Sequence, residues 1–315
     1  MTERGTNGRN PSMDRRHFIQ ALGVLGMGLT LGQARARSTS DPILRPIPAS
    51  GERLPAIGLG SWITLDVGED PRRRASRLPV LQAFFDAGGG MIDSSPMYGS
   101  AEDVIGWCLA RISNKAGLFS ATKVWTVGRD EGQRQIDNSR RLWGVPRLDL
   151  IHVHNLLDWP VQLETLKAMK AEGRVRYIGV TTSHGRRHAE LERIMRREPL
   201  DFVQFTYNLV DREAEALLLP LARERGIAVV INRPFRGGSL FHQVWNKPLP
   251  AWAGEIECAN WAQYFLKFVV SHPAVTCAIP ATSRVDHLLE NMGALYGPLP
   301  DAALRQRMAA HFERL

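Results

Sequence analysis

The sequence is short of several features that would define a protein class by themselves. Its 315 residues contain three cysteines, Cys108, Cys258 and Cys277, whose wide spacing matches neither a metal-binding motif nor a disulfide framework. We therefore expect buried free thiols. No apolar run reaches the length of a membrane span. Lysines and arginines form no blocks interleaved with aromatic residues, which argues against a nucleic-acid partner.

The N-terminal segment differs from the rest of the chain. The paired arginines Arg15 and Arg16 precede a weakly hydrophobic, glycine-containing stretch over residues 19–31, and an A-x-A cleavage site ends at Ala36. This order is typical of a twin-arginine signal peptide over residues 1–36. It predicts the twin-arginine export machinery as a partner and a periplasmic or extracellular location after cleavage. An anchoring helix is the alternative, but the apolar run is too short to cross a bilayer.

The net charge is positive but mild once that segment is set aside. The whole chain carries +8, and residues 1–36 hold five arginines against two acids, so they contribute +3 and the remainder +5. Such an excess suits a phosphorylated small molecule better than nucleic acid.

Beyond a polar, proline-rich stretch over residues 37–50, which we interpret as a linker, short β-rich runs alternate with amphipathic helical segments. Eight such segments predict a (β/α)8 TIM barrel over residues 51–315, and a length of about 265 residues suits this fold. An open doubly wound sheet is the alternative, but no G-x-G-x-x-G follows the first strand. The strands are expected at residues 56–60, 91–93, 118–123, 148–154, 177–181, 202–207, 228–232 and 275–280.

Polar residues end three successive predicted strands. Asp93 ends the second strand, Lys123 the third and His154 the fourth, at intervals close to one strand–helix unit. The C-terminal ends of barrel strands meet at one mouth, where barrel active sites lie. We therefore expect an acid, an ammonium and an imidazole to converge there, with Tyr98 on the loop just beyond Asp93.

This combination predicts a general acid directed at a carbonyl. A free phenol has a pKa of about 10, and a nearby ammonium lowers that pKa by favouring phenolate. Asp93 would hold Lys123 in place, and His154 would orient a substrate oxygen, so that Tyr98 donates the proton. A carbonyl protonated on oxygen also needs a hydride on carbon, which a nicotinamide cofactor supplies and side chains do not.

Six segments of the sequence resemble the aldo/keto reductase family, and the resemblance covers nearly all of residues 52–315. It implies an NADP(H)-dependent reductase that interconverts an aldehyde or ketone and its alcohol, with Tyr98, Asp93, Lys123 and His154 in the catalytic places. The segments are GGGMIDSSPMYGSAED, SATKVW, LDLIHVHN, RVRYIGVTT, FVQFTYNLVDRE and AIPATSRVDHLLEN.

The implied cofactor site departs from the family pattern at four positions. Thr181 and Thr182 stand where the family usually has Ser-Asn, and Asn232 stands where many members have a tyrosine stacked on the nicotinamide. Ala281 replaces a common lysine, so Thr282, Ser283 and Arg284 are left as candidates for the 2′-phosphate. The residues assigned to the cofactor by resemblance are Thr181, Thr182, Gln204, Asn232, Arg233, Pro234, Phe235, Gly237, Gly238, Thr282, Ser283, Arg284, His287, Glu290 and Asn291.

Two other functions remain open from the residues. His152 and His154 lie two apart on one strand and face the same side, as in barrel metal hydrolases, but no further histidine ends another strand in a ligand position. We expect no metal, and we expect His152 to be a core histidine whose hydrogen bonds are satisfied. A barrel that binds nucleotide as a sensor or partner subunit is the second alternative, and the complete Asp-Tyr-Lys-His set argues against it.

The substrate pocket is expected to be open and rather apolar, with Trp62 and Trp125 as walls, and to accept a small-molecule carbonyl. Resupply of NADP(H) is not expected outside the cytoplasm. An exported reductase would therefore carry its cofactor with it and either cycle it between two substrates or depend on a redox partner.

Overall fold

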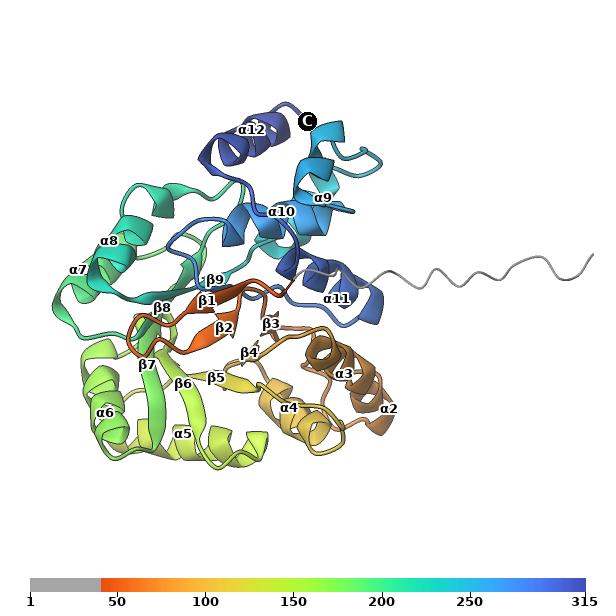
Figure 1. Ribbon diagram of the computed structural model, residues 1–315. Coiled ribbons are helices and arrows are strands. Elements are labelled where there is room, and N and C mark those ends of the chain that lie inside the picture. Colours follow the sequence, from red (N-terminus) through yellow and green to blue (C-terminus); the bar gives the residue numbers. More distant parts are fainter. Residues whose placement is uncertain (1–40) are drawn as a thin grey trace, which may run out of the picture. The chain divides into compact units, whose positions relative to one another are not determined.

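The computed structural model describes residues 41–315 of the chain (Figure 1). The predicted twin-arginine signal over residues 1–36 lies outside the described residues. Within the described part, no helix is both long and apolar enough to cross a membrane.

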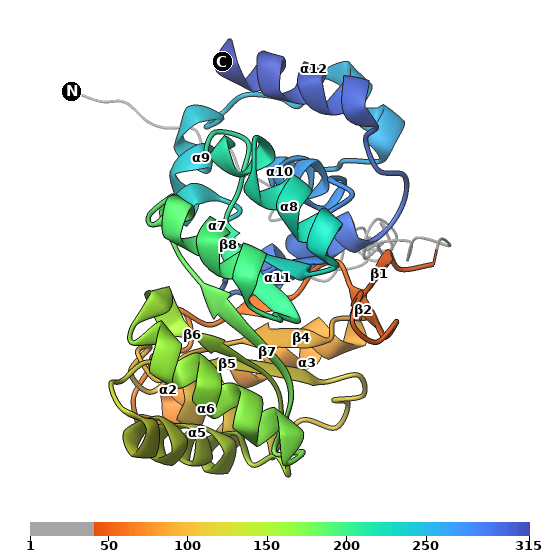
Figure 2. The ribbon, with the colours of Figure 1, turned by 90° about the vertical axis from the view of Figure 1, so that its left-hand side faces the viewer.

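Eight parallel strands form one sheet whose two ends meet. The strand order runs β3 to β10 without a crossover, and parallel bridges from Ile57 to Ala278 and from Gly60 to Ala281 join the first strand to the last. The predicted (β/α)8 barrel is therefore confirmed (Figure 2). The strands are β3 (Leu59–Gly60), β4 (Met91–Asp93), β5 (Phe119–Val124), β6 (Leu148–Val153), β7 (Val175–Thr181), β8 (Phe202–Thr206), β9 (Ala228–Asn232) and β10 (Cys277–Ala278).

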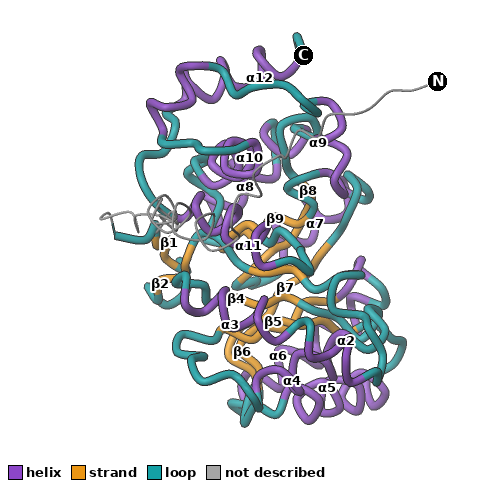
Figure 3. Tube along the Cα trace, turned by 90° about the vertical axis from the view of Figure 1, so that its right-hand side faces the viewer, coloured by secondary structure: helices purple, strands orange, loops and turns teal. Residues whose placement is uncertain are grey.

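Helices surround the strands on the outside of the barrel (Figure 3). The major helices are α2 (Pro71–Ala75), α3 (Leu78–Asp86), α4 (Ala101–Leu109), α5 (Arg129–Trp143), α6 (Trp159–Ala171), α7 (His188–Arg197), α8 (Leu218–Arg225), α9 (Ser239–Gln243), α10 (Trp261–Val270), α11 (Val285–Met292) and α12 (Ala302–Glu313). Short 3₁₀ turns are η1 (His154–Leu156), η2 (Glu213–Glu215), η3 (Arg236–Gly238), η4 (Ala251–Ile256) and η5 (Gly293–Leu295).

The ends of α5 show how local sequence sets these helices. Asp130 and Glu131 lie in its first turn and Arg140 and Arg141 in its last, so both ends oppose the charge of the helix dipole. Gly144 then ends the helix in the left-handed conformation, at φ 66°.

A two-stranded hairpin precedes the barrel and starts inside the stretch that we interpreted as a linker. β1 (Leu44–Pro46) pairs antiparallel with β2 (Arg53–Pro55), and Ile47 and Leu54 are buried with the side chains that fill the lower barrel. Burial of those two apolar side chains explains why the segment folds onto the domain despite its prolines. Residues 44–50 therefore belong to the folded domain rather than to a linker.

The barrel interior changes from apolar to polar along the strands. Its lower layers hold Met91, Phe119, Leu150, Tyr177 and Phe202, all buried. The layers above hold charged and amide side chains, which form the site described next. The three cysteines are buried and free, as predicted.

Candidate active site

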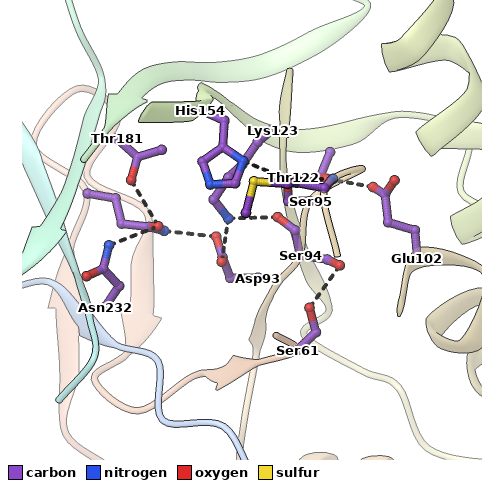
Figure 4. Close-up of polar contacts among 12 residues, drawn as sticks. Ser61, Asp93, Ser94, Ser95, Glu102, Thr122, Lys123, His154, Thr181 and Asn232 are labelled. Atoms are coloured by element: carbon purple, nitrogen blue, oxygen red, sulfur yellow. Dashed lines mark hydrogen bonds and ion pairs between the residues drawn. The ribbon is translucent and has the colours of Figure 1, made fainter. Parts of the chain in front are cut away.

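A buried ion pair lies at the C-terminal end of the barrel strands. Lys123 Nζ on β5 donates to Asp93 Oδ2 on β4 at 2.6 Å and to the Ser94 carbonyl at 2.7 Å (Figure 4). Burial disfavours the ammonium, but Asp93 and Tyr98 outweigh it, and the pKa of Lys123 is raised. Lys123 is fully buried and Asp93 is 2% exposed, so the ammonium depends on this partner to offset the cost of leaving water.

Tyr98 lies over this pair on the loop that follows β4. Lys123 Nζ is 5.2 Å from the centroid of the phenol ring. The loop is fixed by Asp66, whose Oδ1 accepts from the Ser100 amide at 2.9 Å and hydroxyl at 2.8 Å. Gly99 takes φ 58°, and a side chain there would collide with the Asp66 carboxylate, so the residue after the tyrosine has to be glycine.

The pKa of Tyr98 differs in direction from the sequence-based expectation. Burial raises it above 10 and is the larger effect; Lys123 lowers it, as predicted, and Asp93 raises it. The phenol therefore stays protonated near neutrality. Lys123 acts by stabilising the phenolate that forms when the proton leaves, rather than by ionising Tyr98 beforehand.

His154 begins η1, directly after β6, and faces Tyr98. The two rings are 5.7 Å apart between centroids and nearly perpendicular, at 86°. His154 Nδ1 is 2.8 Å from Ser95 Oγ. Burial and, secondarily, Lys123 lower the pKa of His154 to about 3, so its imidazole is neutral at ordinary pH. A neutral ring can bind a substrate oxygen without competing with Lys123 for Asp93.

His152 is a core residue, as expected, but within residues 41–315 neither of its ring nitrogens has a hydrogen-bond partner, so the prediction that its hydrogen bonds are satisfied is wrong. It is fully buried, its ring lies edge-on to Phe202, and burial, with Lys123 and His154, lowers its pKa well below 6.5. In the part of the chain that the structure describes, no group of three or more histidines, cysteines or acids is placed to hold a metal ion. The His152/His154 pair therefore has no third ligand of these types there.

Polar side chains next to the ion pair form a cradle suited to an amide. Gln204 Nε2 donates to Asp93 Oδ1 at 2.9 Å, and Thr181 Oγ1 donates to Gln204 Oε1 at 3.1 Å. Asn232 Nδ2 donates to the Thr182 carbonyl at 2.9 Å. Thr182 Oγ1 is buried and has no hydrogen-bond partner within residues 41–315. An unsatisfied buried hydroxyl is costly, so this atom fits a ligand's carboxamide.

The loop after β9 turns sharply beside this cradle. Gly237 and Gly238 take φ values of 67° and 93°, which favour glycine. The Arg233 guanidinium lies against Gly237, with Nη2 3.4 Å from where a Cβ of residue 237 would be. Burial, as the largest effect, lowers the pKa of Arg233. A half-buried cation beside a glycine turn is suited to bind a phosphate.

The segment after β10 only partly follows the prediction. Thr282 lines the cavity, and its Oγ1 accepts from the Arg284 amide at 3.2 Å. Ser283 and Arg284 are not among the residues that line the cavity. The exposed Arg284 instead pairs with Asp286, with Nε donating to Oδ1 at 3.0 Å. The Arg284 guanidinium, which we predicted to bind the 2′-phosphate, is therefore paired with an acid two residues along the chain.

These groups surround one cavity of about 1130 Å³ at the barrel mouth. Trp62 lines it, as predicted. Trp125 does not: its backbone amide donates to Gln135 Oε1 at 2.6 Å, which holds this segment against α5. The predicted residues that line the cavity are Trp62, Asp93, Tyr98, His154, Thr181, Thr182, Gln204, Asn232, Arg233, Pro234, Phe235, Gly237, Gly238, Thr282, His287, Glu290 and Asn291.

A buried carboxylate behind the site was missed by sequence reasoning. Glu102 on α4 is 2% exposed and accepts from Thr122 Oγ1 at 2.6 Å, Ser139 Oγ at 2.9 Å and Trp143 Nε1 at 3.1 Å. Burial raises its pKa, and the three donors oppose that effect. Thr122 immediately precedes Lys123, so this network ties β5 to α4 and α5. A glutamate in the first turn of a helix gives no sequence signal of such burial.

Comparison with known proteins shows the family of this chain. The sequence matches the aldo/keto reductase family over residues 56–309. It is 30% identical to methylglyoxal reductase YeaE of Escherichia coli (strain K12) over 262 residues, which cover 80% of this chain and 89% of that protein.

Solved structures show the same fold. An aldo-keto reductase from Klebsiella pneumoniae in complex with NADPH aligns with a TM-score of 0.70 and 25% identity over 83% of this chain and 92% of that chain. Aldo-keto reductase AKR11C1 from Bacillus halodurans aligns with a TM-score of 0.70 and 19% identity over 86% and 96%. The chain belongs to the aldo/keto reductase family.

Proposed function

We infer that the protein is an NADP(H)-dependent oxidoreductase that interconverts an aldehyde or ketone and its alcohol, with Tyr98 as the general acid. The observation that carries this inference is the buried Lys123–Asp93 pair under a protonated phenol at the mouth of a family-typical barrel. The relative that reduces methylglyoxal and the neighbour with bound NADPH support the reaction class and the cofactor.

In this proposal the cofactor, when bound, supplies the hydride to the carbonyl carbon. Thr181, Thr182 and Gln204 hold its carboxamide, because the cradle includes an unsatisfied hydroxyl beside the ion pair. Arg233 and the glycine turn lie where they can bind its pyrophosphate.

The catalytic side chains handle the proton. His154 Nε2, the nitrogen not engaged with Ser95, binds the substrate oxygen and orients it toward Tyr98. Tyr98 gives its hydroxyl proton to that oxygen, and Lys123 stabilises the resulting phenolate. Asp93 keeps Lys123 in position and charged. In the direction of alcohol oxidation, the same phenolate accepts the proton.

A panel of aldehydes and ketones with NADPH tests the reaction class. Oxidation of NADPH with at least one carbonyl is expected. Tight nucleotide binding without turnover of any carbonyl would favour a sensor or partner subunit, and stoichiometric metal in the purified protein would favour a hydrolase using His152 and His154.

We propose that the protein binds NADP(H) more tightly than NAD(H), but by a smaller factor than it would if Arg284 were unpaired. Asp286 neutralises Arg284 at the place expected for the 2′-phosphate. Asp286→Asn should free Arg284 and tighten NADPH binding several-fold relative to NADH, since an arginine–phosphate contact is charge-assisted. Arg284→Ala should narrow the preference. Dissociation constants from fluorescence titration measure both effects; equal changes for NADH and NADPH would contradict this assignment.

Export by the twin-arginine route is proposed for the segment before residue 41. This pathway is suited to folded proteins, and bound cofactor stabilises the folded state by mass action. We expect Arg15→Lys/Arg16→Lys to move the protein from the periplasm to the cytoplasm when the fractions are blotted. Periplasmic protein at the wild-type level in the double variant would contradict the route.

The same route implies that NADP(H) is loaded before transport and retained. Mass spectrometry of natively purified, exported protein should then show about one nucleotide per chain. Exported protein that contains no nucleotide and binds NADPH weakly would contradict the captive-cofactor proposal and leave the reductase assignment intact.

A further inference from the structure

The cavity carries more positive charge than its catalytic pair and cofactor loops require. Four cations line it, Arg186, Arg187, Arg233 and Lys247, whereas its acids are Asp93, which is paired with Lys123, and Glu290. The proposed reaction gives no role to one of these four cations, Arg186.

Neighbouring groups engage most of the other cations. Arg187 donates to Glu190 Oε2 and to the Asn155 carbonyl, each at 2.7 Å. Lys247 donates to the Leu315 carbonyl. Arg233 lies on the glycine turn assigned to the cofactor. Within residues 41–315, the Arg186 side chain has no ion pair and no hydrogen bond, so it is free to bind an anion.

The loop that carries Arg186 belongs to the substrate side of the site. It follows β7, and the contact from Arg187 to Asn155 fixes it beside the residue after His154, the group that binds the substrate oxygen. The loops assigned to the cofactor phosphates follow β9 and β10 instead. His184 on the same loop also lines the cavity. Burial, then Arg233 and then Arg186, lower its pKa, so His184 lies near both arginines, Arg233 of the cofactor loop included.

We propose that Arg186, with His184 beside it, forms an anion subsite that selects carbonyl substrates carrying a carboxylate or phosphate group. This inference rests on the proposed reductase function and adds the substrate class. The subsite would bind the acidic end of the molecule at the cavity rim while His154 and Tyr98 bind the carbonyl oxygen. An exposed guanidinium makes charge-assisted hydrogen bonds to either anion, and the contact weakens as salt is added.

Matched aldehydes test this subsite. Succinic semialdehyde is compared with butanal for the carboxylate, and glyceraldehyde 3-phosphate with glyceraldehyde for the phosphate. For at least one pair, kcat/KM should favour the acidic aldehyde by about tenfold in the wild type, mostly through KM. Arg186→Gln should bring that ratio close to one. Arg193→Gln, which removes an exposed arginine from α7, is the matched control and should leave the ratio unchanged.

Other results would overturn the inference. A wild-type preference for the neutral aldehydes in both pairs, or a ratio unaffected by Arg186→Gln, contradicts the subsite. A large rise in the dissociation constant for NADPH with no change in the ratio would assign Arg186 to the cofactor.

Calorimetry separates this inference from the proposed function, because it measures binding of the same aldehydes to protein loaded with NADP⁺ without requiring turnover. Arg186-dependent binding of the acidic aldehyde together with no reduction of any carbonyl would contradict the reductase and keep the subsite. Reduction of carbonyls without Arg186-dependent binding would contradict the subsite and keep the reductase.

Discussion

Tyr98→Phe is expected to lower kcat for carbonyl reduction by about 10²–10⁴-fold while leaving NADPH binding nearly unchanged. Phenylalanine keeps the ring that packs beside His154 and removes only the hydroxyl proton. Steady-state kinetics and a fluorescence titration of NADPH measure the two quantities on the same preparation.

The raised pKa of Tyr98 supports this prediction. Burial keeps the phenol protonated, so the wild type enters the reaction with its proton in place. His154 is neutral and already engaged at Nδ1, and Lys123 is held by Asp93 and the Ser94 carbonyl. His154 Nε2 contacts the same substrate oxygen, but a neutral imidazole gives up its N–H proton far less readily than a phenol does, so neither group is an equivalent substitute donor. A Phe variant with kcat near that of the wild type would refute Tyr98 as the general acid.

Lys123→Met is expected to abolish measurable turnover and to lower the free energy of unfolding by about 3–5 kcal/mol. The substitution removes the charge that stabilises the phenolate. It also leaves the Asp93 carboxylate buried with Gln204 as its remaining side-chain donor. Urea unfolding followed by tryptophan fluorescence measures the stability change.

Two further variants separate these effects. Lys167→Met breaks ion pairs with Glu164 and Glu198 that lie near the surface, and should change stability by about 1 kcal/mol or less. Asp93→Asn/Lys123→Met removes the uncompensated charge and should regain much of the stability lost by Lys123→Met, with no gain in activity. Equal stability of Lys123→Met and the wild type would contradict the importance of the buried pair.

The barrel and the positions of the four catalytic candidates followed from strand spacing and strand ends. Asp93 and Lys123 end or nearly end their strands, and His154 lies one residue past β6. Because residues at strand ends of a parallel barrel converge at one mouth, linear spacing was enough to bring these groups together.

Contacts that depend on where a side chain points could not be predicted from strand spacing. Arg284 stays a predicted phosphate ligand, but the sequence did not indicate that Asp286 pairs with it. Trp125 was read as a pocket wall, but Gln135 holds its backbone to α5. Both outcomes depend on contacts that a one-dimensional pattern does not encode.

Net electrostatic effects were also beyond the sequence. The sequence indicated that Lys123 would lower the pKa of Tyr98, and it does, but the degree of burial decides the net direction. The burial of Glu102 and the fold of residues 44–46 onto the domain have the same origin, since both depend on which surfaces the neighbouring elements cover.

Transfer of deuterium from NADPH labelled at C4 to the carbonyl carbon shows whether the enzyme catalyses direct hydride transfer. One reduced carbonyl from the panel is isolated after incubation with the wild-type enzyme and analysed by mass spectrometry and NMR. With the transferred position of the dihydronicotinamide labelled, we expect one deuterium on the former carbonyl carbon for each NADPH oxidised, and none on the alcohol oxygen after exchange in water. An alcohol product without deuterium for either label position on C4 would contradict direct hydride transfer and with it the reductase assignment.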